Sequence, residues 1–182
     1  MSPFRPDLVD CWIFRLPEDD GSGPEILLIR RSPGRILPGL WQCVSGALEE
    51  GERVALAALR EVAEETGFGP DAIEAFYDLD LVNQFHEPSV DGVMTAAVFA
   101  LRVRPGLDPI LSIEHTAFRW VGLQAAWDEV VWPGYRDAIE RVRDHLILPE
   151  KEPWFRLGLD GQRIADQEPA LLDRQPDGGP AG

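Results

Sequence analysis

The chain has 182 residues, close to the usual size of one domain or slightly above it, and a formal net charge of −15. Such an acidic protein is repelled by a nucleic-acid backbone, and no basic patch with interleaved aromatic residues is present. The N-terminus lacks a signal pattern, and no apolar run approaches the length that spans a bilayer. We therefore expect a soluble cytoplasmic protein that acts on neither a nucleic-acid polymer nor a membrane.

Two strands joined by a polar turn are expected at the start of the chain. Residues 8–16 and 25–30 are largely apolar, and residues 19–24 between them have the composition of a turn. Residues 32–39, rich in Pro and Gly, predict a loop before a short strand over 41–45. Cys11 and Cys43 lie in apolar stretches without metal-type spacing, as expected of buried thiols in a reducing cytoplasm, although a disulfide between them stays open.

The segment from Gly46 to Phe68 predicts a loop followed by an amphipathic helix. At 3.6 residues per turn its apolar residues form one arc and its acidic residues gather on the opposite side. Clustered like charges repel by a few tenths of a kcal/mol per pair unless a cation lies among them. An acidic helix face is often merely solvated, so the helix pattern alone does not decide. The apolar arc comprises Ala55, Ala58, Leu59, Val62 and Ala63, and the acids are Glu61, Glu64 and Glu65.

Further strands are predicted over 76–86, 94–104 and 117–121, where β-branched and aromatic residues recur between Gly and Pro breakers. Helices are predicted over 123–131 and 134–148. In the second helix Ala138, Ile139, Val142 and Leu146 have the spacing of a core-facing stripe. Helices alternating with a mixed sheet indicate a layered α/β/α architecture.

We expect a domain over residues 1–150 and a C-terminal tail over 151–182. Residues 167–182 are rich in Pro, Gly and Asp with little apolar content, which predicts a disordered end. Residues 154–159, with Trp154 and Phe155, are the exception. They are interpreted as an arm that covers the domain, with a contact to a partner or a second copy as the alternative.

The spacing around the acidic helix is the most specific signal in the sequence. Gly46 is followed after five residues by Glu52, and after seven more by Arg60-Glu61-Val62-x-Glu64-Glu65-x-Gly67-Phe68. Every defined position of the Nudix box is filled, so the chain resembles a Nudix hydrolase. The resemblance implies an α/β/α sandwich with a mixed central sheet and hydrolysis of a phosphoanhydride bond.

By this resemblance, Glu61, Glu64 and Glu65 hold metal ions, and Gly46 lends a backbone carbonyl. Arg60 and Glu52 match positions that orient these groups, and a salt bridge pinning the loop to the helix is their expected main role. Several carboxylates on one helix face suit Mg²⁺, which prefers oxygen ligands and bridges carboxylates to substrate phosphates; Mn²⁺ accepts the same ligands. The expected catalytic set is Glu61, Glu64, Arg60 and Glu114.

Glu114 is the candidate base outside the box. The run Glu114-His115-x-Ala117-Phe118-Arg119-Trp120 resembles a segment of bacterial Nudix enzymes that act on dihydroneopterin triphosphate and nucleoside triphosphates. In those relatives the matching Glu is a further metal ligand. An exposed loop acid is the alternative for Glu114.

Substrate contacts are expected from two groups of residues. Aromatic faces suit a flat base or pterin, and guanidinium groups bind phosphates with two hydrogen bonds. Core packing explains the aromatic residues equally well, and a solvated strand end is the default interpretation of the arginines. The aromatic candidates are Trp41, Phe85 and Trp132, and the arginines are Arg30, Arg31 and Arg35.

These patterns predict Mg²⁺-dependent hydrolysis of a small nucleoside-diphosphate-linked compound, a nucleoside or pterin triphosphate that yields monophosphate and pyrophosphate. Cleavage of a dinucleoside polyphosphate is the second hypothesis. A catalytically silent domain that senses a nucleotide is the third, although the intact carboxylate set argues against it. A homodimer is possible, but no segment identifies an interface.

Overall fold

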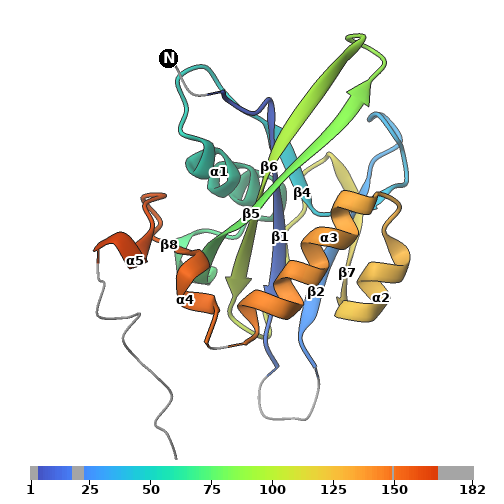
Figure 1. Cartoon of the computed structure of the whole chain (residues 1–182). Helices are drawn as coiled ribbons and strands as arrows, with labels where there is room; N and C mark the ends of the chain where they lie inside the picture. Colours follow the sequence, from blue (N-terminus) through green and yellow to red (C-terminus); the bar gives the residue numbers. More distant parts are fainter. Residues whose placement is uncertain (1–3, 18–22, 149, 168–182) are drawn as a thin grey trace, which may run out of the picture.

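The computed structural model describes residues 4–17, 23–148 and 150–167 (Figure 1). Within these ranges eight strands form one sheet in the order β3-β2-β1-β6-β5-β8, with β4 beside β1 and β7 beside β2. The expected turn at 19–24 and the expected disordered end fall largely outside the described residues. The strands are β1 Leu8–Arg15, β2 Glu25–Arg31, β3 Trp41–Gln42, β4 Val44–Ala47, β5 Ile73–Glu87, β6 Gly92–Val103, β7 His115–Gly122 and β8 Arg156–Leu157.

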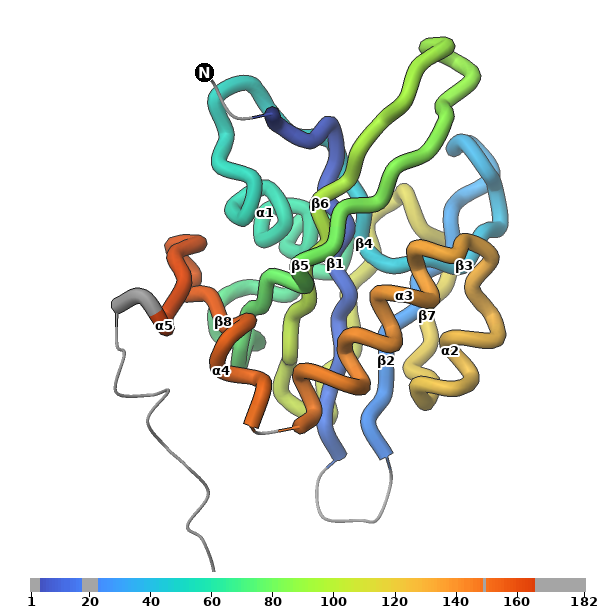
Figure 2. Tube along the Cα trace, in the orientation of Figure 1, coloured from blue at the N-terminus to red at the C-terminus, as the bar shows by residue number. Residues whose placement is uncertain are grey.

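Helices cover both faces of this sheet (Figures 1 and 2). Helix α1 packs on one face, where Ala57, Ala58 and Val62 join a buried apolar cluster. Helices α2 and α3 close the other face through Ala126, Ala138 and others. β1 and β6 run parallel and the other pairs are antiparallel, which confirms the predicted α/β/α sandwich with a mixed sheet. The helices are α1 Val54–Thr66, α2 Leu123–Glu129, α3 Pro133–Arg141, α4 Glu152–Phe155 and α5 Ile164–Gln167, with single turns Pro70–Ala72 and Val142–Leu146.

Strand β1 changes partner along its length, and this places the box loop. Its last residues, Phe14 and Arg15, pair with β2, whereas residues 8–11 pair with β4. The register sets Val9 opposite Gly46 and Asp10 opposite Ser45. Because side chains alternate between the faces of a strand, Ser45 and Gly46 point to opposite sides of the sheet. The box loop follows β4, which ends at Ala47, and precedes α1, which begins at Val54.

The buried face of α1 differs from the predicted arc. Ala63 is exposed, and Glu65, assigned to the outward acidic side, has only 5% of its surface exposed. The stripe that meets the sheet runs through Ala58, Val62 and Glu65, which follow one another at helical spacing. Ala63 lies five residues from Ala58, roughly 140° around the helix, and so faces away. An acidic side chain therefore points into the protein.

Most predicted element boundaries hold to within a few residues, with two differences. The strand predicted over 41–45 is divided into β3 and β4 at Cys43. The helix predicted over 134–148 is regular only to Arg141 and continues as one π-helical turn from Val142 to Leu146. The core stripe predicted for this helix is nevertheless buried at all four positions. Cys11 and Cys43 are buried free thiols, as expected.

The segment after residue 150 packs on the sheet. β8 pairs with β5, with Leu157 opposite Phe76, and the Tyr77 hydroxyl donates a 2.7 Å hydrogen bond to Glu152. Arg53, just before α1, donates to the backbone oxygen of Asp160. The predicted covering arm thus pairs with β5 through β8, and the residue just after the arm contacts the start of the box helix. Within the described ranges, no helix is both long enough and apolar enough to cross a membrane.

Candidate active site

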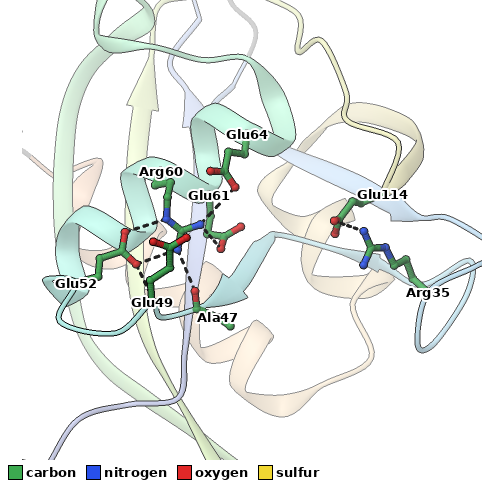
Figure 3. A network of polar contacts seen from close by, with 8 residues as sticks. All are labelled: Arg35, Ala47, Glu49, Glu52, Arg60, Glu61, Glu64 and Glu114. Carbon is green, nitrogen blue, oxygen red and sulfur yellow. Dashed lines mark hydrogen bonds and ion pairs between the residues drawn. The ribbon is translucent and has the colours of Figure 1, made fainter.

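Arg60, on α1, is the centre of a network of charged groups that joins the box loop to the helix (Figure 3). Its Nε and Nη2 donate to the two carboxylate oxygens of Glu52 at 2.8 and 2.9 Å. Its Nη1 reaches Glu61 at 2.7 Å and Glu64 at 3.3 Å, and Nη2 also donates to the Ala47 oxygen at 3.0 Å. The Arg60 guanidinium lowers the pKa of Glu52 to about 2. Arg60 therefore ties the box loop to α1 and holds two of the predicted metal ligands.

Gly46 allows the Glu61 carboxylate to lie directly against the backbone of β4. A Cβ atom at position 46 would lie 1.9 Å from Glu61 Cδ and 2.1 Å from its Oε1, far inside van der Waals contact. Glycine is the residue that permits such an approach. The structure thus brings Gly46 and Glu61, two predicted metal-site residues, into contact.

Glu65, a further predicted metal ligand on α1, has a buried side chain. Glu65 Oε2 is buried and has no hydrogen-bond partner in the described part of the chain. Burial, followed by the nearby charges of Glu61 and Glu114, raises the pKa of Glu65 to about 8. Burial likewise raises the pKa of Glu61. Carboxylates that disfavour one another's charge in a buried place are the arrangement that a bound cation relieves.

The predicted metal ligands have the oxygen donors that a divalent cation requires, but their side chains do not converge on one point in this structure. Among the described residues, no three Asp, Glu, His or Cys side chains converge closely enough to hold a metal ion. Glu61 and Glu64 are turned toward Arg60, and Glu114 toward Arg35. The unpaired carboxylate oxygen of Glu65 and the backbone carbonyl oxygen of Gly46 are hard donors of the type that Mg²⁺ prefers. Binding of a cation would therefore require these carboxylates to turn away from the arginines.

Glu114 comes to the site from the loop before β7. The loop lies against the end of α1, since Ser112 N donates to the backbone oxygen of Glu65 at 3.1 Å. The Glu114 carboxylate is partly exposed and forms an ion pair with Arg35 (Figure 3). A backbone hydrogen bond fixes this loop, since Ser32 N donates to the backbone carbonyl oxygen of Glu114 at 2.8 Å. Glu114, the predicted base, and Arg35, a predicted phosphate contact, thus form an ion pair with each other.

His115 is a buried neighbour of Glu65. Its Nε2 lies 3.9 Å from Glu65 Oε2, too far for a hydrogen bond. Burial, reinforced by the positive charges of Arg31 and Arg35, lowers the pKa of His115 to about 4. His115 is therefore neutral at physiological pH and supplies no positive charge to offset the acids.

The other arginine and tryptophan candidates lie on or beside the loop 32–39. Arg31 is occupied within the protein: its Nε donates to Ile36 O at 2.7 Å and its Nη1 to Gln42 at 3.1 Å. Arg30 is exposed and contacts the Gly39 oxygen at 3.4 Å. The ring of Trp41 carries the Arg119 guanidinium 4.2 Å from its centroid. Arg119, which was not among the predicted site residues, thus lies beside Trp41.

Phe85 and Trp132 are exposed aromatic side chains, at 40% and 43% of their surface. Phe85 lies on the outer part of β5, and Trp132 immediately precedes α3. The sequence patterns did not indicate a polar pair near Phe85, in which Asn83 Nδ2 donates a 3.1 Å hydrogen bond to Asp10 Oδ2. The available signal was Asp10 itself, a charged residue inside an otherwise apolar strand.

The family comparison agrees with this geometry. A family model described as the NUDIX domain matches residues 9–142. The chain belongs to the Nudix family. The solved structure of the Escherichia coli dihydroneopterin triphosphate pyrophosphohydrolase has a TM-score of 0.58 and 26% identity to this Nudix protein, covering 73% of the present chain and 92% of the other.

Three curated relatives differ in what they are named for. The dihydroneopterin triphosphate diphosphatase of Escherichia coli K12 is 30% identical over 110 residues, 56% of this chain and 71% of that enzyme. The RNA pyrophosphohydrolase of Dinoroseobacter shibae is 30% identical over 117 residues, 57% and 72% of the two chains. The octanoyltransferase of Myxococcus xanthus is 38% identical over 126 residues, 67% of this chain but 34% of that protein. This Nudix chain therefore spans about a third of the last relative's length.

Proposed function

We propose that this Nudix protein is a Mg²⁺-dependent pyrophosphohydrolase that cleaves a nucleoside or pterin triphosphate to the monophosphate and pyrophosphate. The observation that carries the proposal is the buried, unpaired oxygen of Glu65 beside Glu61 and Glu114. Carboxylates that hold Mg²⁺ would suit a polyanionic substrate, because the cation bridges them to the substrate phosphates. The similarity to a dihydroneopterin triphosphate diphosphatase supports the substrate class.

In this proposal water attacks phosphorus, a new P–O bond forms, and the bridging oxygen leaves with pyrophosphate. Bound Mg²⁺ would neutralise the phosphates and favour deprotonation of the attacking water. Glu61, Glu64 and Glu65, with the Gly46 carbonyl, would hold the cation, and Mn²⁺ suits the same donors. Arg60, which donates to Glu61 and Glu64 at 2.7 and 3.3 Å, would hold both carboxylates beside the site until they turn toward the cation.

Glu114 would act as the base that takes the proton from water, or as a further ligand. It is the acid of the site that does not come from the box, and its partner is the exposed Arg35 rather than Arg60. When substrate arrives, Arg35 would exchange this carboxylate for a phosphate, which a guanidinium binds equally well. Arg30, at the adjoining strand end, would meet the distal phosphate. These exchanges would release Glu114 as substrate binds.

The test is a product analysis of purified protein with Mg²⁺ and dATP, GTP, dihydroneopterin triphosphate, diadenosine tetraphosphate and ADP-ribose. Monophosphate and pyrophosphate in equal amounts support the proposal. ATP released from the dinucleotide would move the assignment to a dinucleoside polyphosphate hydrolase. Ligand binding without turnover of any compound would indicate a nucleotide sensor. We place this reaction in the cytoplasm, where Cys11 and Cys43 remain reduced; pairing of two copies stays a prediction.

A further inference from the structure

The start of α1 lacks the local features that usually hold a helix end in place. Arg53 is its N-cap residue, yet in the described part of the chain the Arg53 side chain makes no capping hydrogen bond, and the first turn carries no acidic residue. Such groups stabilise the first turn, whose backbone N–H groups have no partner within the helix. Arg5 donates to the backbone oxygen of Glu52, where the box loop joins the helix. A second contact comes from the segment after residue 150.

A turn at residues 158–161 makes this second contact (Figure 1). Arg53 Nη1 donates a 2.7 Å hydrogen bond to the backbone oxygen of Asp160. A Cβ atom added at Gly161 would lie 2.9 Å from the Cβ of Ala55, closer than two carbon atoms pack. Glycine is therefore the residue that lets the turn approach the helix this closely.

The turn is held in one conformation by its own backbone. Gly158 N donates to the backbone oxygen of Gln162, and Gly161 N donates to the backbone oxygen of Gly158, both at 2.8 Å. Asp160 Oδ1 accepts a 3.0 Å hydrogen bond from Gln162 N. Gly161 has a φ of +73°, which L side chains rarely adopt. The turn therefore presents a fixed surface to α1.

Strand β8, just before the turn, anchors it to the sheet. Leu157 pairs with Phe76 of β5 and has only 7% of its surface exposed. It belongs to the same buried cluster as Ala58 and Val62 of α1. The segment from β8 to the turn thus connects the edge strand of the sheet to the first turn of the helix.

The contacted end of α1 is close to the proposed metal-binding groups. Glu52, at the junction of loop and helix, forms the ion pair with Arg60. Ala55 and Glu61 are six residues apart on one helix, a rise of about 9 Å. The Glu61 carboxylate lies against the backbone of Gly46. Because a helix moves as a stiff rod, a shift of its start would change the position of Glu61 on β4.

We propose that the turn 158–161 is a positioning element of the active site, which fixes the start of α1 and so keeps Glu61 beside Gly46. Gly161 and Arg53 are its positioning residues, and they act through Glu61. The proposal rests on the proposed function, which gives the box acids the cation. The turn follows the segment that matches the family model, so its residues are not positions of the box.

Gly161→Ala tests the contact, because the added methyl would push the turn away from Ala55. The amides of Leu56 and Ala57 donate to the Arg53 oxygen, and their hydrogen exchange should become about fivefold faster as the start of α1 loosens. Mg²⁺ binding without substrate, measured by calorimetry, should weaken about threefold or more. At saturating Mg²⁺, kcat should fall about tenfold while KM stays within about twofold.

Gly106→Ala is the matched control. Gly106 has a φ of +75°, so alanine there meets the same backbone strain as at Gly161. Its added Cβ would meet no described atom within 4 Å. Both variants should therefore lose thermal stability, but Gly106→Ala should keep the exchange rates at Leu56 and Ala57, the Mg²⁺ affinity and kcat of the wild type.

Ala55→Gly in the Gly161→Ala background is a rescue that a purely structural role would not show. It removes the methyl group that the new side chain meets, so kcat and Mg²⁺ affinity should return to within about twofold of those of Ala55→Gly alone. The backbone strain at position 161 remains, so the thermal stability should not return with them.

Arg53→Ala is a milder variant that leaves the core intact, since Arg53 is exposed. It removes the hydrogen bond to Asp160 and should speed exchange at the same two amides, with a fall in kcat of about twofold to threefold. Arg143→Ala, which removes an exposed arginine paired with Asp144, is its control and should change neither quantity.

The proposal is overturned if Gly161→Ala and Gly106→Ala have the same kcat per folded molecule, or if Ala55→Gly restores nothing. Lower thermal stability without faster exchange at Leu56 and Ala57 would also overturn it. The proposed function fails separately: if the wild type hydrolyses no triphosphate while Gly161→Ala still speeds exchange and weakens Mg²⁺ binding, the positioning role stands without the pyrophosphohydrolase.

Discussion

Arg60 and Glu52 form a two-point ion pair, with 2.8 Å from Nε to Oε1 and 2.9 Å from Nη2 to Oε2. This pair closes the box loop onto α1, and both side chains are mostly shielded from solvent, at 23% and 16% exposure. A lysine at position 60 would keep the charge but lose the planar fork. The geometry of the loop, rather than its charge, therefore depends on arginine.

Arg60→Lys should lower the free energy of unfolding by about 1 to 2 kcal/mol, since charge-assisted hydrogen bonds are lost. It should also lower kcat, because Glu61 and Glu64 lose their common donor. Urea unfolding and steady-state kinetics measure the two effects. Arg143→Lys is the matched control: Arg143 makes the same two-point pair with Asp144, but both are half-exposed, so little stability should be lost. Equal losses in both variants would contradict the role of Arg60.

Gly46→Ala should remove activity without unfolding the protein. The added methyl would meet the Glu61 carboxylate at 1.9 Å, and the side chain must move. Displacement of a catalytic group by about 1 Å can cost roughly 100-fold in rate. Gly122→Ala is the control, because its added Cβ meets no atom within 4 Å and its φ of −60° suits alanine. Turnover of Gly46→Ala near the wild-type rate would show that Glu61 does not need this position.

Mg²⁺ affinity should rise with pH up to about 8. The pKa of Glu65 is raised to about 8, so at pH 7 a cation must displace its proton, and affinity falls by up to about tenfold per pH unit below the pKa. Without metal, the folded state keeps a proton between about pH 4.5 and 8 that the unfolded chain has lost, so stability falls as pH rises through this window. Calorimetry in two buffers measures proton release. Glu65→Gln should abolish it, and an unchanged release would assign the proton elsewhere.

Glu114→Gln should lower kcat at least about tenfold while thermal stability stays nearly constant. The ion pair of Glu114 with Arg35 is exposed at 40% and 43%, and such surface pairs contribute about 0 to 1 kcal/mol. General-base catalysis contributes about 100-fold or more to rate. Glu74→Gln removes a comparable pair, with Arg102, away from the site and should leave kcat unchanged. A wild-type rate in Glu114→Gln would indicate that one of the box acids, and not Glu114, is the general base.

Local patterns predicted the layered fold, and the resemblance to the Nudix box implied the ion pair of Arg60 with Glu52. Alternating apolar residues predict the strands, and the fixed spacing from Gly46 to Phe68 predicts the loop and helix. The burial of Glu65 was not predictable in this way. A helical pattern assigns acids to solvent, whereas the packing of α1 against β4 and β1 turns this one inward.

Contacts between distant segments were also beyond sequence patterns. β8 has two residues and too little length for a periodic signal, yet it pairs with β5. Asn83 and Gly134 look like an ordinary strand residue and an ordinary helix start. The backbone of Gly134 nevertheless lies against the Asn83 amide, and this contact depends on the approach of α3 to β5, which neither segment encodes by itself.

The most direct test of the proposed site is the Mg²⁺ dependence of turnover in Glu64→Gln. Glu64 is the box acid with the most exposed side chain, at 60%, and its removal should not disturb the core. We expect kcat to fall at least about 100-fold and to stay low at saturating Mg²⁺, with an unchanged unfolding curve. Wild-type turnover at saturating Mg²⁺ would contradict the assignment of the box acids as the metal site.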